Sequence, residues 1–185
     1  MAFIDTVDEQ AATGELKEVY DKLLRNRGKV ANIMKVHSLN PRAMQAHMDL
    51  YLAVMFGRSG LKRAERELTA VVVSATNGCA YCVQHHAEAL NSYWKDSERV
   101  QRLTRDFRHA GLSGRETAML DYVVKLTRAP ETVMEADVAA LRAQGLEDSD
   151  VLDLNLITSY FNFVNRIALG LGVEVSPEEV SGYRY

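Results

Sequence analysis

Both cysteines of this 185-residue chain lie in the stretch NGCAYCVQHH, as Cys79 and Cys82. Two cysteines at this spacing can be a redox-active dithiol, part of a metal site, or a chance or structural placement. If the segment is helical, Cys79, Cys82 and His86 lie on one face, because spacings of three and four residues complete about one turn. Residues three apart on a helix have Cα atoms roughly 5 Å apart, which a disulfide accepts. The two sulfurs can therefore join without unfolding the helix.

The residues around the two cysteines could activate either thiol. A helix that begins at Cys79 favours the Cys79 thiolate, because its first turn has unpaired N–H groups and a positive dipole end. His86 follows Cys82 by four residues and could act as its base. Glu67 precedes Cys79 with eleven residues between them and lies on the flank of the apolar stripe of the preceding predicted helix. It is the carboxylate that could orient and charge His86.

Other uses of the two thiols stay open at this point. A zinc site would take Cys79, Cys82 and either His85 or His86, but a structural zinc needs four ligands, and the chain has no second CxxC and no HxxxH. A general thiol–disulfide reductase and a non-enzymatic dithiol sensor would use the same cysteines. Val83 follows Cys82, so the CxxCH haem-attachment pattern is absent. We expect neither a metal nor an organic cofactor.

Composition narrows the class of protein. The chain is 47% hydrophobic and 25% charged with a formal net charge of −3, which is typical of a soluble globular protein and not of a nucleic-acid surface. No run of about 18 apolar residues indicates a membrane span. The N-terminal residues MAFIDTVDEQAATGE lack the basic region and apolar core of a signal peptide, so we expect a cytoplasmic protein. In that compartment a CxxC is more often catalytic or metal-binding than structural.

The elements that position these residues are predicted to be helices throughout. We find no alternating strand pattern and no flexible linker, which predicts one all-α domain over residues 1–185, a multi-helix bundle. Helix starts are predicted at four capping patterns: Thr13, Asn40 before Pro41, Ser113 with Glu116, and Thr132 with Glu135. Helix ends are predicted at Asn77-Gly78, Pro130 and Gly145.

Three further segments complete the predicted bundle. The motif helix begins at Cys79 and continues to about Trp94. Residues 149–169 are apolar on nearly all sides, which predicts burial in the core or at a subunit interface. Ser176, followed by Pro177, could begin one more short helix.

The order E-x11-C-x-Y-C-x3-H resembles the E-x11-C-x-H-C-x3-H pattern of the alkylhydroperoxidase D-like family, within the carboxymuconolactone decarboxylase superfamily. The stretches NIMKVHSLNPRAMQAH and NFVNRIALGLGVEV also resemble the peroxidase-related branch of that family. The resemblance implies an all-helical fold, a homo-oligomer and a peroxidase that reduces hydroperoxides with its CxxC. It also implies that Cys82 attacks the peroxide and that Cys79 resolves the product as a disulfide. Glu67 and His86 would relay protons, and an external dithiol would restore the thiols.

Two observations bear on how the residue roles of the family apply to this chain. Tyr81 stands where the family often has histidine, and a phenol with a pKa of about 10 is a poor base at neutral pH. We therefore assign Tyr81 no proton-transfer role. The helix dipole favours Cys79 as the attacking thiol, but we favour Cys82, because a base on the same helix face is the more specific device. A lactone decarboxylase of the same superfamily is the weakest alternative, since such enzymes do not need the CxxC.

Overall fold

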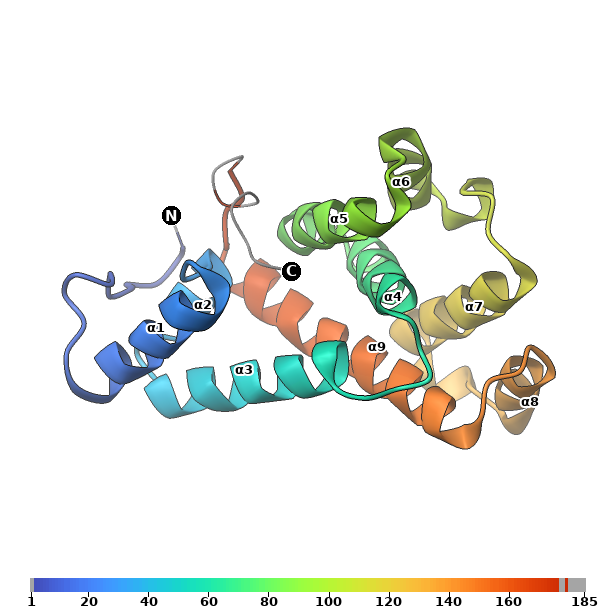
Figure 1. Cartoon of the computed structure of the whole chain (residues 1–185), viewed down its shortest axis with the longest axis horizontal. Coiled ribbons are helices and arrows are strands. Elements are labelled where there is room, and N and C mark those ends of the chain that lie inside the picture. Colours follow the sequence, from blue (N-terminus) through green and yellow to red (C-terminus); the bar gives the residue numbers. More distant parts are fainter. Residues whose placement is uncertain (1, 177–178, 180–185) are drawn as a thin grey trace.

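The computed structural model describes residues 2–176 and residue 179, and all regular structure in these residues is helical (Figure 1). The prediction of an all-α fold is thus confirmed. In chain order the helices are α1 (Gly14–Arg27), α2 (Asn32–Lys35), α3 (Pro41–Phe56), α4 (Arg63–Thr76), α5 (Ala80–Trp94), α6 (Ser97–Arg105), α7 (Gly114–Arg128), α8 (Glu135–Ala143) and α9 (Asp148–Gly170). Two short 3₁₀ turns, η1 (Phe107–His109) and η2 (Pro130–Thr132), follow α6 and α7.

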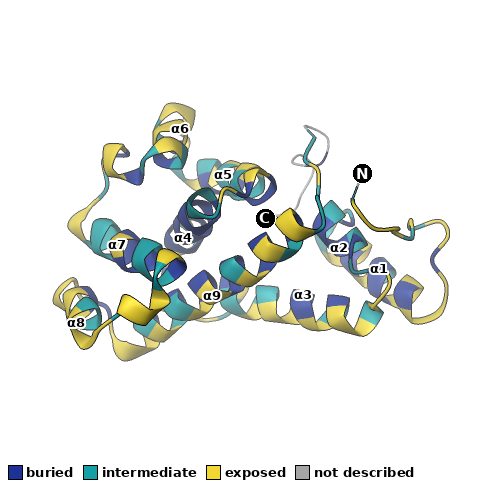
Figure 2. Ribbon diagram, turned by 180° about the vertical axis from the view of Figure 1, so that it is seen from behind, coloured by how far each residue is buried: buried dark blue, intermediate teal, exposed yellow. Residues whose placement is uncertain are grey.

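Helix α4 forms the centre of the core. Every residue from position 65 to position 74 is buried, and the helix packs against α5, α7 and α9. Figure 2 shows it dark over nearly its whole length, whereas the surrounding helices have exposed outer faces. A polar side chain on α4 therefore needs a partner within the protein, because water cannot reach it.

The long apolar helix α9 runs between α3 and the pair formed by α4 and α5 (Figure 1). Its inner face is buried, but Leu152, Leu156 and Phe163 are 58%, 40% and 47% exposed. These three residues are spaced by four and seven positions, so they lie on one face of the helix. Complete burial within the chain was one of the two predictions for this segment, and it is wrong; the alternative, a subunit interface, stays a prediction.

Most predicted helix starts match the structure. Helix α1 follows Thr13, the Asn40 side chain accepts a hydrogen bond from the backbone of Ala43 at 3.1 Å, and the Ser113 capping box is present. The start predicted at Thr132 is wrong. Thr132 ends η2 and donates to the carbonyl of Ala129, while the side chain of Asp137 accepts from the Met134 N–H at the true start of α8. Pro177 and Glu178, which the predicted helix after Ser176 needs, lie outside the described residues.

The turn between α4 and α5 places the cysteines. The Asn77 N–H still donates to Val73 in α4, and Gly78 then adopts a φ of +71°, a left-handed conformation that suits glycine. The Cys79 N–H donates back to the Ser74 carbonyl at 2.9 Å, and the Cys79 carbonyl accepts from Val83 at 2.9 Å. Cys79 is therefore the N-cap residue of α5, and the helix itself begins at Ala80, one position after the predicted start.

Candidate functional site

The two cysteine thiols face each other at the start of α5. The Sγ atoms of Cys79 and Cys82 are 3.0 Å apart, and both residues are free, buried thiols with 1% and 4% exposure. A disulfide bond is about 2.05 Å long, so a small movement of the sulfurs is enough to form it. The sequence-predicted pairing of these cysteines is thus geometrically available.

The two thiols differ in acidity. Once Cys79 is ionised, the Cys82 thiol donates a hydrogen bond to it; this is the main reason that the pKa of Cys79 falls to about 7, and backbone N–H groups of Cys82 and Tyr81 act in the same direction. The same bond, together with burial, raises the pKa of Cys82. In the resting pair, Cys79 therefore carries the charge just above neutral pH and Cys82 carries the proton. This agrees with the helix-dipole argument for Cys79.

Glu67 and His86 meet as the sequence predicted. Glu67 on α4 is 1% exposed, and its Oε2 accepts a hydrogen bond from His86 Nδ1 at 2.7 Å. Its Oε1 accepts from an Arg63 guanidinium nitrogen at 2.8 Å. Because a carboxylate can only accept, the Nδ1 of His86 carries a proton, and Nε2 of the neutral ring is left with a lone pair. The imidazole is thus in the tautomer that can take a proton at Nε2.

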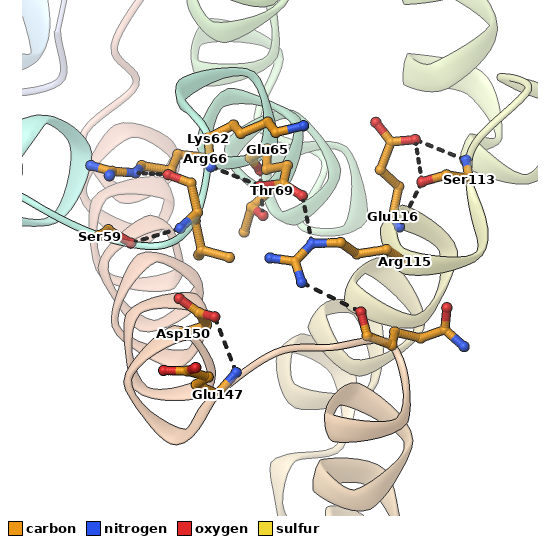
Figure 3. Close-up of polar contacts among 12 residues, drawn as sticks. Ser59, Lys62, Glu65, Arg66, Thr69, Ser113, Arg115, Glu116, Glu147 and Asp150 are labelled. Atoms are coloured by element: carbon orange, nitrogen blue, oxygen red, sulfur yellow. Dashed lines mark hydrogen bonds and ion pairs between the residues drawn. The ribbon is translucent and has the colours of Figure 1, made fainter.

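A second acid on α4, Glu65, has a different task. Its Oε1 accepts from Arg115 of α7 at 2.9 Å, and its Oε2 accepts from the Lys62 N–H at 2.7 Å (Figure 3). Glu65 therefore caps its own helix and ties it to α7.

A cavity of about 100 Å³ opens between α1, α2, α3, α5 and α9. Cys82 and His86 both line it, together with Tyr160 and Phe161. The remaining wall is mostly apolar and includes Leu23, Ile33, Met34, Met48, Ala89 and Val164. Cys82, the protonated partner, is thus the thiol that a small molecule in the cavity can reach.

Tyr81 also lines the cavity. It is 5% exposed, and its hydroxyl donates to Glu179 Oε1 at 2.7 Å and accepts from the Ile33 N–H at 3.2 Å. Glu179 also accepts from the Asn32 N–H at 2.7 Å and pairs with Lys29. These contacts join the chain beyond α9 to α2 and α5, so Tyr81 holds one side of the cavity together.

His85, which the sequence offered as a possible zinc ligand, lies on the cavity wall. Its ring packs against that of Tyr81 with centroids 4.5 Å apart. Burial, followed by the charges of His86 and Lys29, lowers the pKa of His85 to about 3. His85 is therefore neutral at physiological pH.

The sequence missed one residue of the cavity wall, Tyr160, and its buried partner, His47. His47 of α3 and Tyr160 of α9 are buried and joined by a hydrogen bond of 2.7 Å between Nε2 and the hydroxyl. His47 shares its helix face with the apolar residues Met44 and Tyr51, at spacings of three and four. A histidine within an apolar stripe was the available signal.

The described residues offer little to a metal ion. Within 2–176 and 179, no group of three or more His, Cys, Asp or Glu side chains is arranged to hold one. Over the same part of the chain, every helix is too short or too polar to cross a membrane.

Comparison with known proteins identifies the family of this chain. A profile of the carboxymuconolactone decarboxylase family matches residues 41–121. The structure of an uncharacterized peroxidase-related protein from Silicibacter sp. TM1040 has a TM-score of 0.89 and 31% identity, over 99% of this chain and 96% of that one. The chain belongs to the alkylhydroperoxidase D-like proteins of the carboxymuconolactone decarboxylase superfamily.

Two further relatives extend this assignment. The alkylhydroperoxidase AhpD core of an uncharacterized peroxidase-related protein from Ralstonia eutropha JMP134 has a TM-score of 0.88 and 29% identity, over 97% of this chain and 94% of that one. The alkyl hydroperoxide reductase AhpD of Gluconacetobacter diazotrophicus is 36% identical over 61 residues, which are 32% of this chain and 34% of that protein. Membership of the alkylhydroperoxidase D-like group supports an antioxidant or peroxidase role at a general level.

Proposed function

We propose that this protein is a thiol peroxidase that reduces a small hydroperoxide with Cys82 and Cys79. The observation that carries the proposal is the 3.0 Å contact between two free thiols, one of which lines a cavity beside His86. The relatives named as peroxidase-related or as alkyl hydroperoxide reductase support the same reaction class.

The first step forms a bond between Cys82 and oxygen. Cys82 must first lose its proton, and both the Cys79 thiolate and His86 Nε2 are bases that can take it. The Cys82 thiolate then attacks the terminal oxygen of R–O–O–H, the O–O bond breaks, and Cys82 becomes a sulfenic acid. The released alkoxide takes up a proton and leaves as the alcohol. Glu67 stabilises His86 while the ring is protonated.

The second and third steps use the low pKa of Cys79. The Cys79 thiolate attacks the Cys82 sulfenic acid, which gives the disulfide and releases hydroxide, protonated to water. An external dithiol then attacks Cys82 from the cavity and displaces Cys79, and its second thiol closes to complete the exchange. When Cys82 is bonded to another atom, the backbone N–H groups of Cys82 and Tyr81 still lower the pKa of Cys79. A thiol of lower pKa leaves faster, so these groups favour regeneration.

Peroxide consumption with dithiothreitol as the dithiol tests this proposal. Cys82→Ser should abolish turnover and leave no sulfenic acid for dimedone to trap. Cys79→Ser should also stop turnover, but one equivalent of peroxide should still oxidise Cys82 to a dimedone-reactive product. A wild-type protein that cleaves a small disulfide but leaves peroxide intact is a general reductase, and that result would overturn the proposal.

The proposal also includes the oligomeric state of the protein and its location in the cell. We place the enzyme in the cytoplasm, where cellular dithiols keep cysteines reduced. We expect a homo-oligomer that buries the exposed face of α9 formed by Leu152, Leu156 and Phe163, because apolar side chains gathered on one surface mark association sites. Size-exclusion chromatography with light scattering of Phe163→Glu against wild type tests the interface, and an unchanged mass would contradict it.

A further inference from the structure

A second row of hydrogen-bonded side chains leads from the cavity toward the surface. The Tyr160 hydroxyl lies 2.7 Å from His47 Nε2, and His47 Nδ1 lies 3.2 Å from His37 Nε2. His37 Nδ1 lies 2.8 Å from the carbonyl oxygen of Ile33. His47 and Tyr160 are buried, while His37 is partly exposed. The row contains none of the residues used in the proposed reaction.

The contact between His37 and the Ile33 carbonyl, at the outer end of the row, fixes the direction of every hydrogen bond in it. The Ile33 carbonyl can only accept, so His37 Nδ1 carries the proton. Burial lowers the pKa of His37, and burial together with His37 lowers the pKa of His47 to about 3, so both rings are neutral at physiological pH. Each neutral ring has one donor and one acceptor nitrogen. His47 therefore donates from Nδ1 to His37 Nε2 and accepts at Nε2.

The last bond of the row fixes the role of Tyr160. Because His47 Nε2 is an acceptor, the single O–H of Tyr160 must point at it and cannot point into the cavity. The phenol oxygen keeps acceptor capacity but has no donor left. Tyr160 lines the cavity together with Cys82. The Tyr81 hydroxyl on the same wall already donates to Glu179.

We propose that Tyr160 selects substrates that carry a hydrogen-bond donor next to the reacting atom, and that His47 and His37 position it for this role. The inference rests on the proposed peroxidase function, for which it names the substrate class. A hydroperoxide has such a donor in its terminal O–H, the group whose oxygen Cys82 attacks. A dialkyl peroxide or a disulfide has none, so the same cavity disfavours both.

A pair of isomers tests the selection without any turnover. Cyclobutanol and tetrahydrofuran are isomers of similar size, but only the alcohol can donate. We expect the reduced wild-type protein to bind cyclobutanol about fivefold more tightly, which is the effect of one net hydrogen bond. Titrations followed by NMR chemical shifts of the cavity methyl groups measure both dissociation constants.

Two variants should remove the preference for cyclobutanol, one by weakening the binding of cyclobutanol and the other by strengthening the binding of tetrahydrofuran. Tyr160→Phe deletes the acceptor and should weaken cyclobutanol alone. His47→Leu lets the Tyr160 hydroxyl rotate and donate into the cavity, so it should strengthen tetrahydrofuran binding. Tyr51→Phe removes another phenol hydroxyl from the cavity wall and should leave the preference unchanged.

The outcomes separate this inference from the proposed function. Equal binding of the two isomers by wild type, or a preference that survives in Tyr160→Phe, would overturn the role of Tyr160 even if the protein reduces peroxide. A clear preference in a protein that reduces no peroxide would keep the role of Tyr160 in recognising donors and refute the peroxidase. For an active enzyme, the ratio of kcat/KM for tert-butyl hydroperoxide to that for di-tert-butyl peroxide should fall in Tyr160→Phe.

Discussion

Replacing Glu67 by glutamine is the sharpest test of the proton relay, because the change keeps the shape of the side chain and removes its charge. Glu67 joins the Arg63 guanidinium to the Nδ1 of His86. A glutamine has one oxygen to share between these two donors. The charged Arg63 should keep the oxygen, which turns the amide NH₂ toward His86. His86 must then accept at Nδ1 and carry its proton at Nε2, so its basic nitrogen is lost.

The expected size of the effect follows from this change of tautomer. A positioned acid or base contributes about 10²–10⁴-fold to a rate, so kcat/KM for peroxide should fall at least about 100-fold. Hydrogen bonds to charged groups contribute about 1.5–3 kcal/mol and neutral ones about 0.5–1.5. The free energy of unfolding should therefore fall by only about 1–3 kcal/mol, which urea denaturation can measure.

Glu65→Gln is a matched control on the same helix. Glu65 is also a buried carboxylate with one arginine and one N–H partner, namely Arg115 and the backbone of Lys62 (Figure 3). It should lose similar stability and keep the peroxide rate. In a His86→Gln background, Glu67→Gln should cost no further activity, because the two residues act as a unit. A folded Glu67→Gln enzyme with the wild-type rate, or an equal loss in Glu65→Gln, would refute the relay.

Three further predictions test the acidity of the dithiol and the packing around it. Thiolate absorbance at 240 nm should rise by one thiolate with a midpoint of about pH 7, because the pKa of Cys79 is lowered to about 7, and Cys79→Ser should remove this step. Arg66 donates to three backbone carbonyls before α4; Arg66→Met should cost about 2–4 kcal/mol in urea denaturation, since a buried acceptor left unpaired costs about 1–3 kcal/mol. Ser113→Ala removes the cap of α7. It should lower the free energy of unfolding, measured by thermal denaturation, by about 1 kcal/mol and leave the peroxide rate unchanged.

The sequence predicted the contacts within the candidate site, Cys79 with Cys82 and Glu67 with His86, because the geometry that produces them is local. Cys79, Cys82 and His86 lie within two turns of one helix, and the turn at Gly78 connects that helix directly to the one that carries Glu67. Helical spacing and a glycine stop are enough to align such residues. Capping residues likewise predicted the starts of α1, α3 and α7, and in α3 and α7 the side-chain and backbone partners are three positions apart.

The cavity could not be predicted in the same way. Its walls come from five helices, and the contact between His47 and Tyr160 joins residues 113 positions apart. No periodicity within one helix reports such a contact. Hydrophobicity also misjudged burial, because α4 with its charged residues is central while the more apolar α9 keeps an exposed face. The three buried charged residues of α4 have partners inside the protein: Glu65 pairs with Arg115 of α7, Arg66 donates to backbone carbonyls, and Glu67 accepts from His86 of α5.

The groups proposed to react lie within residues 67–86, on α4, on α5 and at the turn between them, whereas most of the cavity wall belongs to α1, α2, α3 and α9. Reactivity and molecular recognition are thus encoded in separate parts of the chain. Substitutions in the outer helices can change which molecule enters while the sulfurs, the imidazole and the carboxylate keep their alignment. A fold divided in this way can acquire new substrates through substitutions in its outer helices while the residues proposed to react stay the same.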